Sequence, residues 1–149
     1  MRSNNELALE LVKELVKRGS ARPIESENAV AQFIFEYLSD LKLKPQKLYY
    51  ENDRFSVIVI GQDDPQLIIN GHMDTVPVGD RSSWDFDPYG EVKDGRFYGR
   101  GSADTKGQIA AILAAMATCF NERVCYIFNV EEEMSLNGIK SALAYLQKE

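Results

Sequence analysis

The sequence predicts an α/β domain with three layers, helix–sheet–helix, around a mostly parallel central sheet. Apolar runs of strand length at 55–60, 66–69 and 123–130 alternate with segments whose apolar residues recur every three or four positions. Irregular polar loops separate these segments, and the sequence contains no internal repeat or low-complexity tract. In such sheets ligands bind outside the carboxyl ends of the strands, so the residues that follow each strand are the ones to examine.

Composition restricts the possible partners. The chain has 149 residues, of which 44% are hydrophobic and 27% charged, which is typical of one globular domain. A net charge of −6 argues against nucleic acid or an anionic membrane as the main partner. No apolar stretch approaches the ~20 residues that span a bilayer, and the N-terminus predicts a charged helix rather than a signal peptide. Cys119 and Cys125 are expected to be buried free thiols of a cytoplasmic protein.

The helical segments have clear boundaries. Ser3 and Glu6 have the spacing of a capping box, and an apolar stripe follows them up to Gly19. The listed segments share the helical spacing of apolar residues: 3–19, about 26–41, 108–119 and about 139–146. The expected strands are 47–50, 55–60, 66–69, 123–130 and a hairpin of 91–92 with 96–98.

Polar residues stand at three separate places beside this sheet. His72, the only histidine, follows the strand 66–69, and the run Glu131–Glu133 follows the strand 123–130. Asp104 precedes the helix that connects the two strands. A single histidine is more often structural, and an acidic run is usually a solvated turn. Because all three places belong to one edge of the predicted sheet, we expect their side chains to converge.

The residue types at this edge favour a metal centre. One imidazole with carboxylates from separate loops is the ligand set of a catalytic Zn²⁺ that keeps a position open for water. Asp74 could accept the second N–H of His72, and a remaining glutamate could take a proton from the water.

A nucleotide-binding loop is the alternative for the glycine-rich segment 99–107. Gly99 and Gly101 begin a G-x-G-x-x-G pattern, but its sixth position is Asp104, whose charge would repel a pyrophosphate. Lys106 is followed by Gly107 rather than by Ser or Thr, so the P-loop pattern is also incomplete. The sequence therefore disfavours nucleotide binding.

At these residues the chain resembles the zinc amidohydrolases that include acetylornithine deacetylase, succinyl-diaminopimelate desuccinylase, aminoacylases and glutamate carboxypeptidase. The resemblance runs from about Gln66 to Gly138. The matching segments are 71–77, 98–107, and 131–133 with Gly138, and Trp84 followed by 87–89 resembles the segment between the first two. Glu131 stands where the family usually has Asp, and Ser135 where a glycine is common.

The resemblance implies a site that holds two Zn²⁺ ions, for which Co²⁺ could substitute. His72 would bind one ion and Asp74 would orient it. Asp104 would bridge both ions and be followed by a cis peptide bond, and Glu133 would bind the other ion. Glu132 would be the general base.

The implied reaction is attack of a metal-bridging water, deprotonated by Glu132, on an amide carbonyl. The expected substrate is a small N-acyl amino acid, which would place the enzyme in amino-acid biosynthesis; a di- or tripeptidase or a carboxypeptidase is the alternative. The complete enzyme is expected to be a homodimer.

Length is the main departure from the family. Members are much longer and carry a further acidic ligand, a C-terminal histidine ligand and an inserted lid or dimerisation domain. After Glu133 this chain offers only Glu149 as an acid, and it has no second histidine. We therefore expect residues 1–149 to be the N-terminal part of a metallo-exopeptidase-like catalytic domain, inactive alone. A non-catalytic module that lacks a complete metal site is the alternative.

Overall fold

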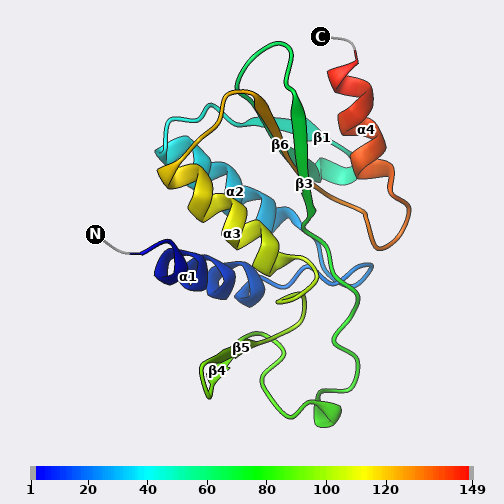
Figure 1. Ribbon diagram of the computed structural model, residues 1–149. Helices are drawn as coiled ribbons and strands as arrows, with labels where there is room; N and C mark the ends of the chain where they lie inside the picture. The colour runs from blue at the N-terminus through cyan, green and yellow to red at the C-terminus, as the bar shows by residue number, and fades with distance from the viewer. Residues whose placement is uncertain (1–2, 148–149) are drawn as a thin grey trace.

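The computed structural model describes residues 3–147 and places helices on both faces of a twisted sheet (Figure 1). The helices are α1 (Asn4–Lys17), α2 (Asn28–Asp40), α3 (Lys106–Thr118) and α4 (Asn137–Leu146). In spatial order the sheet contains β1 (Gln46–Tyr49), β2 (Phe55–Ile60), β6 (Val124–Asn129) and β3 (Leu67–His72). A separate hairpin of β4 (Glu91–Lys93) and β5 (Arg96–Tyr98) lies beyond the carboxyl end of β3, at the bottom of the view.

The predicted α/β class is confirmed, but the prediction of a mostly parallel sheet is wrong. β1 and β2 are antiparallel, β2 and β6 are antiparallel, and among the described strands of this sheet only β3 and β6 are parallel. The connections at 50–54 and 61–66 are too short for a parallel crossover, which needs a dozen or more residues. The long connection from β3 to β6, which contains α3, is the one that keeps the strand direction.

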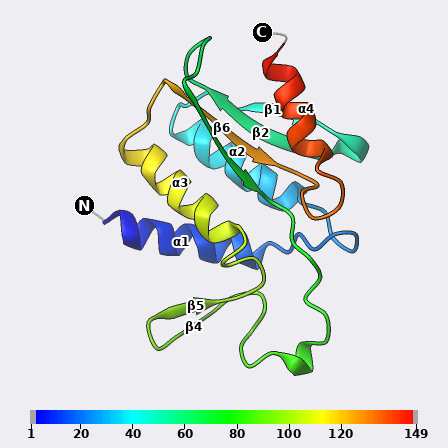
Figure 2. The ribbon, with the colours of Figure 1, turned by 45° about the vertical axis from the view of Figure 1, so that its right-hand side comes forward.

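The core occupies both faces of the sheet because side chains of one strand alternate between them. On one face Val57 and Val59 pack in a large apolar cluster with residues of α1, α2 and α3. On the other face Ile58 and Ile127 pack against Ala142 of α4. Figure 2 shows α2 and α3 on one side of the sheet and α4 on the other, so the predicted three layers are present over residues 3–147.

Two expectations about side chains meet different outcomes. Both cysteines are free thiols, and Cys125 is buried as predicted, whereas Cys119 is exposed because it follows the last turn of α3 at the surface.

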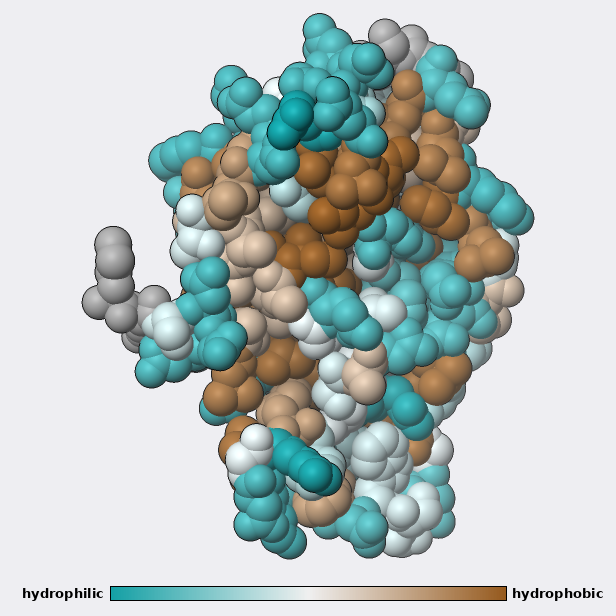
Figure 3. Space-filling model, viewed as in Figure 1, coloured by the Kyte–Doolittle hydropathy of each residue, from teal (hydrophilic) through white to brown (hydrophobic). Residues whose placement is uncertain are grey.

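On the final helix Leu143 is exposed while Ile139 packs against the sheet. Apolar side chains gather over β3 and α4 on the face in Figure 3. Leu67 and Ile68 of β3 are among the exposed apolar residues. Within residues 3–147 the longest apolar helix falls short of a membrane-crossing length.

Gly138 provides a test of how α4 meets the sheet. A methyl group added at Gly138 would clash with the carbonyl oxygen of Val130, a backbone atom that cannot rotate away. We therefore expect Gly138→Ala to lower the free energy of unfolding by about 1–3 kcal/mol, as overpacking does. Urea denaturation measures this loss. Ser141→Ala on the exposed side of the same helix is the control and should stay within ~0.5 kcal/mol of the parent; an equal loss in both variants would contradict the close approach.

Candidate metal centre

The parallel pairing of β3 with β6 brings two distant segments to one edge of the sheet. His72 is paired with Asn129, and the N–H of Met73 donates to the carbonyl of Asn129 at 2.8 Å. Both strands therefore end at the same level, and the loop 131–136 begins beside His72. The segment after His72 is fixed by Thr75, whose N–H donates to the carbonyl of Ser20 at 3.1 Å.

The imidazole of His72 is largely buried and contacted at both nitrogens. Its Nε2 lies 2.9 Å from Oδ1 of Asp104, and its Nδ1 lies 3.0 Å from the backbone carbonyl of Asp74. The side chain of Asp104 is itself exposed and follows the glycine-rich loop. The peptide bond from Asp104 to Thr105 is cis, as the family resemblance implies, and Thr105 Oγ1 donates to the carbonyl of His72 at 2.8 Å.

The carboxylate of Asp74 is fully buried and is directed mainly at the glutamate loop. Its Oδ1 accepts the N–H of Glu132 at 3.1 Å, and its Oδ2 accepts the N–H of Glu133 at 2.9 Å. Oδ1 lies 3.6 Å from Nδ1 of His72, farther than the backbone carbonyl of the same residue. Asp74 thus touches both halves of the site: the carbonyl orients the imidazole and the carboxylate holds the loop.

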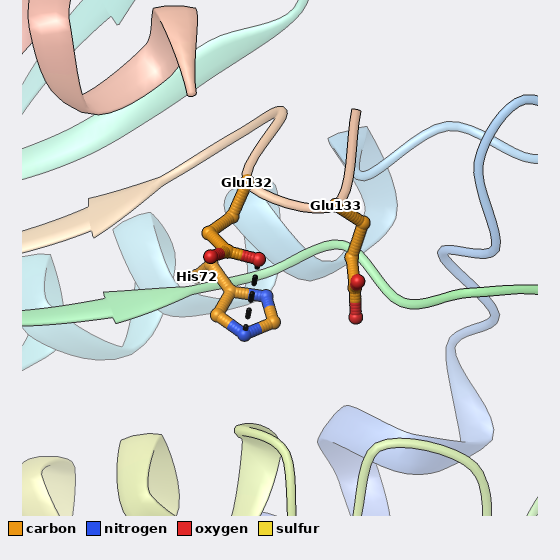
Figure 4. A group of neighbouring side chains, drawn as sticks. All are labelled: His72, Glu132 and Glu133. Atoms are coloured by element: carbon orange, nitrogen blue, oxygen red, sulfur yellow. Dashed lines mark ion pairs between the residues drawn. The ribbon is translucent and has the colours of Figure 1, made fainter. Parts of the chain in front are cut away.

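Three potential metal donors converge above the sheet edge (Figure 4). Among the described residues, one donor atom each from His72, Glu132 and Glu133 lies within 4.8 Å of the others. Nε2 of His72 and Oε2 of Glu132 are 3.9 Å apart. A tetrahedral ion that binds two donors at ~2.1 Å holds them roughly 3.4 Å apart, so the three donors would have to move closer together through side-chain adjustments to bind one divalent cation. Asp104 contacts His72 and, with Glu133, lines a cavity of about 160 Å³.

The charges at this edge are also unbalanced in favour of a cation. Burial and the nearby carboxylates of Glu132, Asp104 and Asp74 raise the pKa of Glu133, against the opposing effect of His72. Burial opposes the charged form of Asp74, yet the pKa of Asp74 is lowered because His72 and the two backbone N–H groups stabilise its anion. A cation bound beside these carboxylates would offset their negative charge.

The glycine-rich loop lacks the features of a phosphate site. The side chain of Lys106 is buried, and its Nζ donates to the carbonyl of Arg18 at the end of α1 at 2.9 Å. Burial lowers the pKa of Lys106 to about 8, which Glu25 partly opposes. A lysine held in this way ties α1 to α3 and is not directed at a ligand.

One buried group of charged residues beside this site could not be found from the sequence. Arg54 lies next to Glu27 and Glu131, and all three side chains are largely removed from solvent. An arginine before an apolar strand and a glutamate before a helix are ordinary at exposed positions. Only the tertiary structure shows that these residues surround the start of the glutamate loop.

The sequence of this chain is similar to known proteins. Residues 68–149, more than half of the chain, match the model of peptidase family M20/M25/M40. The chain is 34% identical to succinyl-diaminopimelate desuccinylase of Vesicomyosocius okutanii and 31% identical to that of Thioalkalivibrio sulfidiphilus. These alignments cover 94% and 93% of this chain but 39% of each relative. The chain thus spans about two fifths of the length of these relatives.

Solved structures with the same fold are more distant in sequence. An M20 family metallo-carboxypeptidase of Sulfolobus solfataricus superposes with a TM-score of 0.74 at 24% identity, over 85% of this chain and 31% of its own. A tripeptidase of Staphylococcus aureus superposes with a TM-score of 0.69 at 23% identity, over 95% of this chain and 40% of its own.

The protonation of His72 is directly measurable because the chain has one histidine and gives one set of imidazole resonances. Burial disfavours the imidazolium, but the carboxylates of Asp74 and Asp104 outweigh burial and raise the pKa of His72 to about 9. We expect an NMR titration of the metal-free chain to give this value. Since the pKa is raised in the folded state, protonation stabilises the fold fully below pH ~6.5, and this contribution is lost as the pH rises to about 9.

Asp104→Asn should lower the pKa of His72, whereas Asp87→Asn on an exposed loop should leave it unchanged. A midpoint near the ordinary 6.5 in the parent chain would contradict the geometry of Asp74 and Asp104 around the ring.

Proposed function

Because this chain belongs to peptidase family M20/M25/M40, we propose that it carries part of the catalytic centre of a zinc-dependent amide hydrolase. The observation that supports this proposal best is the convergence of the donor atoms of His72, Glu132 and Glu133 within 4.8 Å. His72 ends β3 and the two glutamates lie in the loop after β6, so segments about 60 residues apart in sequence bring an imidazole and two partly buried carboxylates together.

Metal binding is assigned to His72, Asp104 and Glu133. The complete site would hold two Zn²⁺ ions, with Co²⁺ as a substitute, and would need further ligands beyond these three. When bound, the metal supplies Lewis acidity toward the scissile carbonyl and toward the attacking water. Asp104 is suited to a shared position because its exposed carboxylate already reaches Nε2 of His72.

Glu132 is assigned the role of general base. Its side chain is about 40% exposed, and its Oε2 lies 3.9 Å from Nε2 of His72. It would accept a proton from the attacking water and deliver it to the leaving amine. Asp74 would keep the backbone of Glu132 in place through the 3.1 Å hydrogen bond to its N–H.

The proposed substrate is an N-acyl amino acid, and the proposed reaction is its deacylation. The two relatives described above are named as succinyl-diaminopimelate desuccinylases, which supports a succinylated or similarly acylated diamino acid. Hydrolysis of a di- or tripeptide, or release of a C-terminal residue, is the second candidate, because the structural neighbours include a tripeptidase and a carboxypeptidase.

A cytoplasmic location and a homodimeric complete enzyme remain predictions, as does inactivity of the 149-residue chain alone.

Metal binding by this chain is testable without turnover. We expect calorimetric titration with Zn²⁺ to show one site, and His72→Ala to weaken it by more than the ~10–100-fold that an outer-shell partner costs. The affinity should rise with pH toward about 9, since the ion displaces the proton of His72. Asp87→Asn, which removes a carboxylate from an exposed loop, is the control. Identical curves for the parent chain and His72→Ala would remove the assignment.

The base assignment requires a polypeptide of full family length that contains this segment. In such a protein Glu132→Gln should lower kcat by at least ~10²–10⁴-fold, the contribution typical of general acid–base catalysis, while metal content stays near that of the parent. Activity on an N-succinyl amino acid and metal analysis of the same sample measure the two effects. Turnover retained by Glu132→Gln would rule out the base role.

A further inference from the structure

A buried arginine joins two carboxylates next to the glutamate loop. Arg54, directly before β2, donates from Nε to Oε2 of Glu27 at 2.9 Å and from Nη2 to Oε1 at 2.6 Å. Glu27 stands directly before α2 and is fully buried. This two-point pairing fixes the guanidinium plane, because both donors of the fork meet one carboxylate.

The same two residues hold Glu131 at its side chain and at its backbone. Nη2 of Arg54 also donates to the carboxylate of Glu131, and the N–H of Glu131 donates to Oε1 of Glu27 at 3.2 Å. Arg22 adds a longer ion pair, 3.7 Å from its Nε to Oε2 of Glu131. Glu131 is therefore tied to the starts of both α2 and β2.

The contacts of Glu131 hold an unfavourable backbone conformation. Its φ of +66° lies in the left-handed region, which residues other than glycine rarely adopt. Its carbonyl accepts the N–H of Leu136 at 2.9 Å, which closes the turn that carries the other two glutamates. A glutamate in this conformation makes contacts that a glycine could not, since its carboxylate reaches Arg54.

The hydrogen bonds continue along the loop. Three consecutive N–H groups, of Glu131, Glu132 and Glu133, are accepted by the buried carboxylates of Glu27 and Asp74. In Figure 4 the side chains of Glu132 and Glu133 leave this loop toward the level of the His72 ring. The direction of these two side chains depends on the backbone of the loop, and Glu131 is the first residue of the loop whose backbone is held by these contacts.

We propose that Glu27, Arg54 and Glu131 are positioning residues that set the turn from which Glu132 and Glu133 reach the metal centre. This inference rests on the proposed function, which gives those two glutamates their roles. Arg54 also balances charge, because without it the carboxylates of Glu27 and Glu131 would face each other in a buried space. The loop would then relax, and both glutamates would lose their alignment with His72.

The test uses the 149-residue chain and four variants. Glu131→Gln keeps the size of the side chain and removes its charge, and Arg54→Met removes the guanidinium. Arg54→Lys keeps the charge but not the two-point fork. Ile127→Val is the control, since it lowers stability from β6 on the face toward α4 without touching the loop.

Hydrogen exchange of the Glu132 and Glu133 amides, followed by NMR, reports the loop without any metal. In Glu131→Gln and Arg54→Met both amides should exchange roughly fivefold faster, the ratio that corresponds to one typical hydrogen bond. Arg54→Lys should be intermediate and Ile127→Val unchanged. Co²⁺ titration should show affinity falling ~10–100-fold in the same order, with a change in the visible absorption of the bound ion.

The inference would be overturned if folded Glu131→Gln and Arg54→Lys kept the amide exchange rates and the Co²⁺ spectrum of the parent. Glu27, Arg54 and Glu131 would then stabilise the fold without positioning the loop. These two variants decide the question if Arg54→Met does not fold. If the parent chain binds no Co²⁺ but the amides respond as expected, the proposed function fails while the control of the loop by Arg54 is upheld.

Discussion

The parallel register of β3 with β6 is the constraint on which the site depends. Because His72 and Asn129 are paired, the imidazole and the glutamate loop leave the sheet at the same level. A shift by one residue would turn every side chain of β3 to the other face and remove His72 from the loop. The long connection through α3 makes this pairing parallel, and it delivers Asp104 to the same edge just before the helix begins.

Much of this arrangement could be predicted from local pattern. The apolar spacing gave α2 within about two residues of its bounds, and the motif resemblance to the family is confirmed by the match over residues 68–149. Strand direction was not predictable from periodicity, although the short connections at 50–54 and 61–66, which leave no room for a parallel crossover, were a signal for the two antiparallel pairs. Nor was the Arg54 group, since a charged residue becomes buried only when distant partners neutralise it.

Buried carboxylates hold the backbone of the loop, and each of them depends on a neighbouring cation. Glu27 and Asp74 are both fully buried, and each accepts backbone N–H groups of the loop 131–133. Arg54 offsets one of these carboxylates and His72 the other. Removing either cation would leave an uncompensated charge in the interior, which is far more costly than the loss of a surface pair.

A proton on His72 and a bound metal ion would each offset the negative charge of the surrounding carboxylates. Asp74, Asp104, Glu132 and Glu133 place four carboxylates around one imidazole, and in the metal-free chain a proton offsets part of their charge. A divalent cation would take that proton's place at Nε2 and bring twice the charge, so the features that raise the pKa of His72 also favour metal binding. The pKa of Glu133 is raised first by burial and then by the neighbouring carboxylates of Glu132, Asp104 and Asp74, which a bound cation would offset. The electrostatics of this edge therefore follow from its geometry and agree with the role proposed for it.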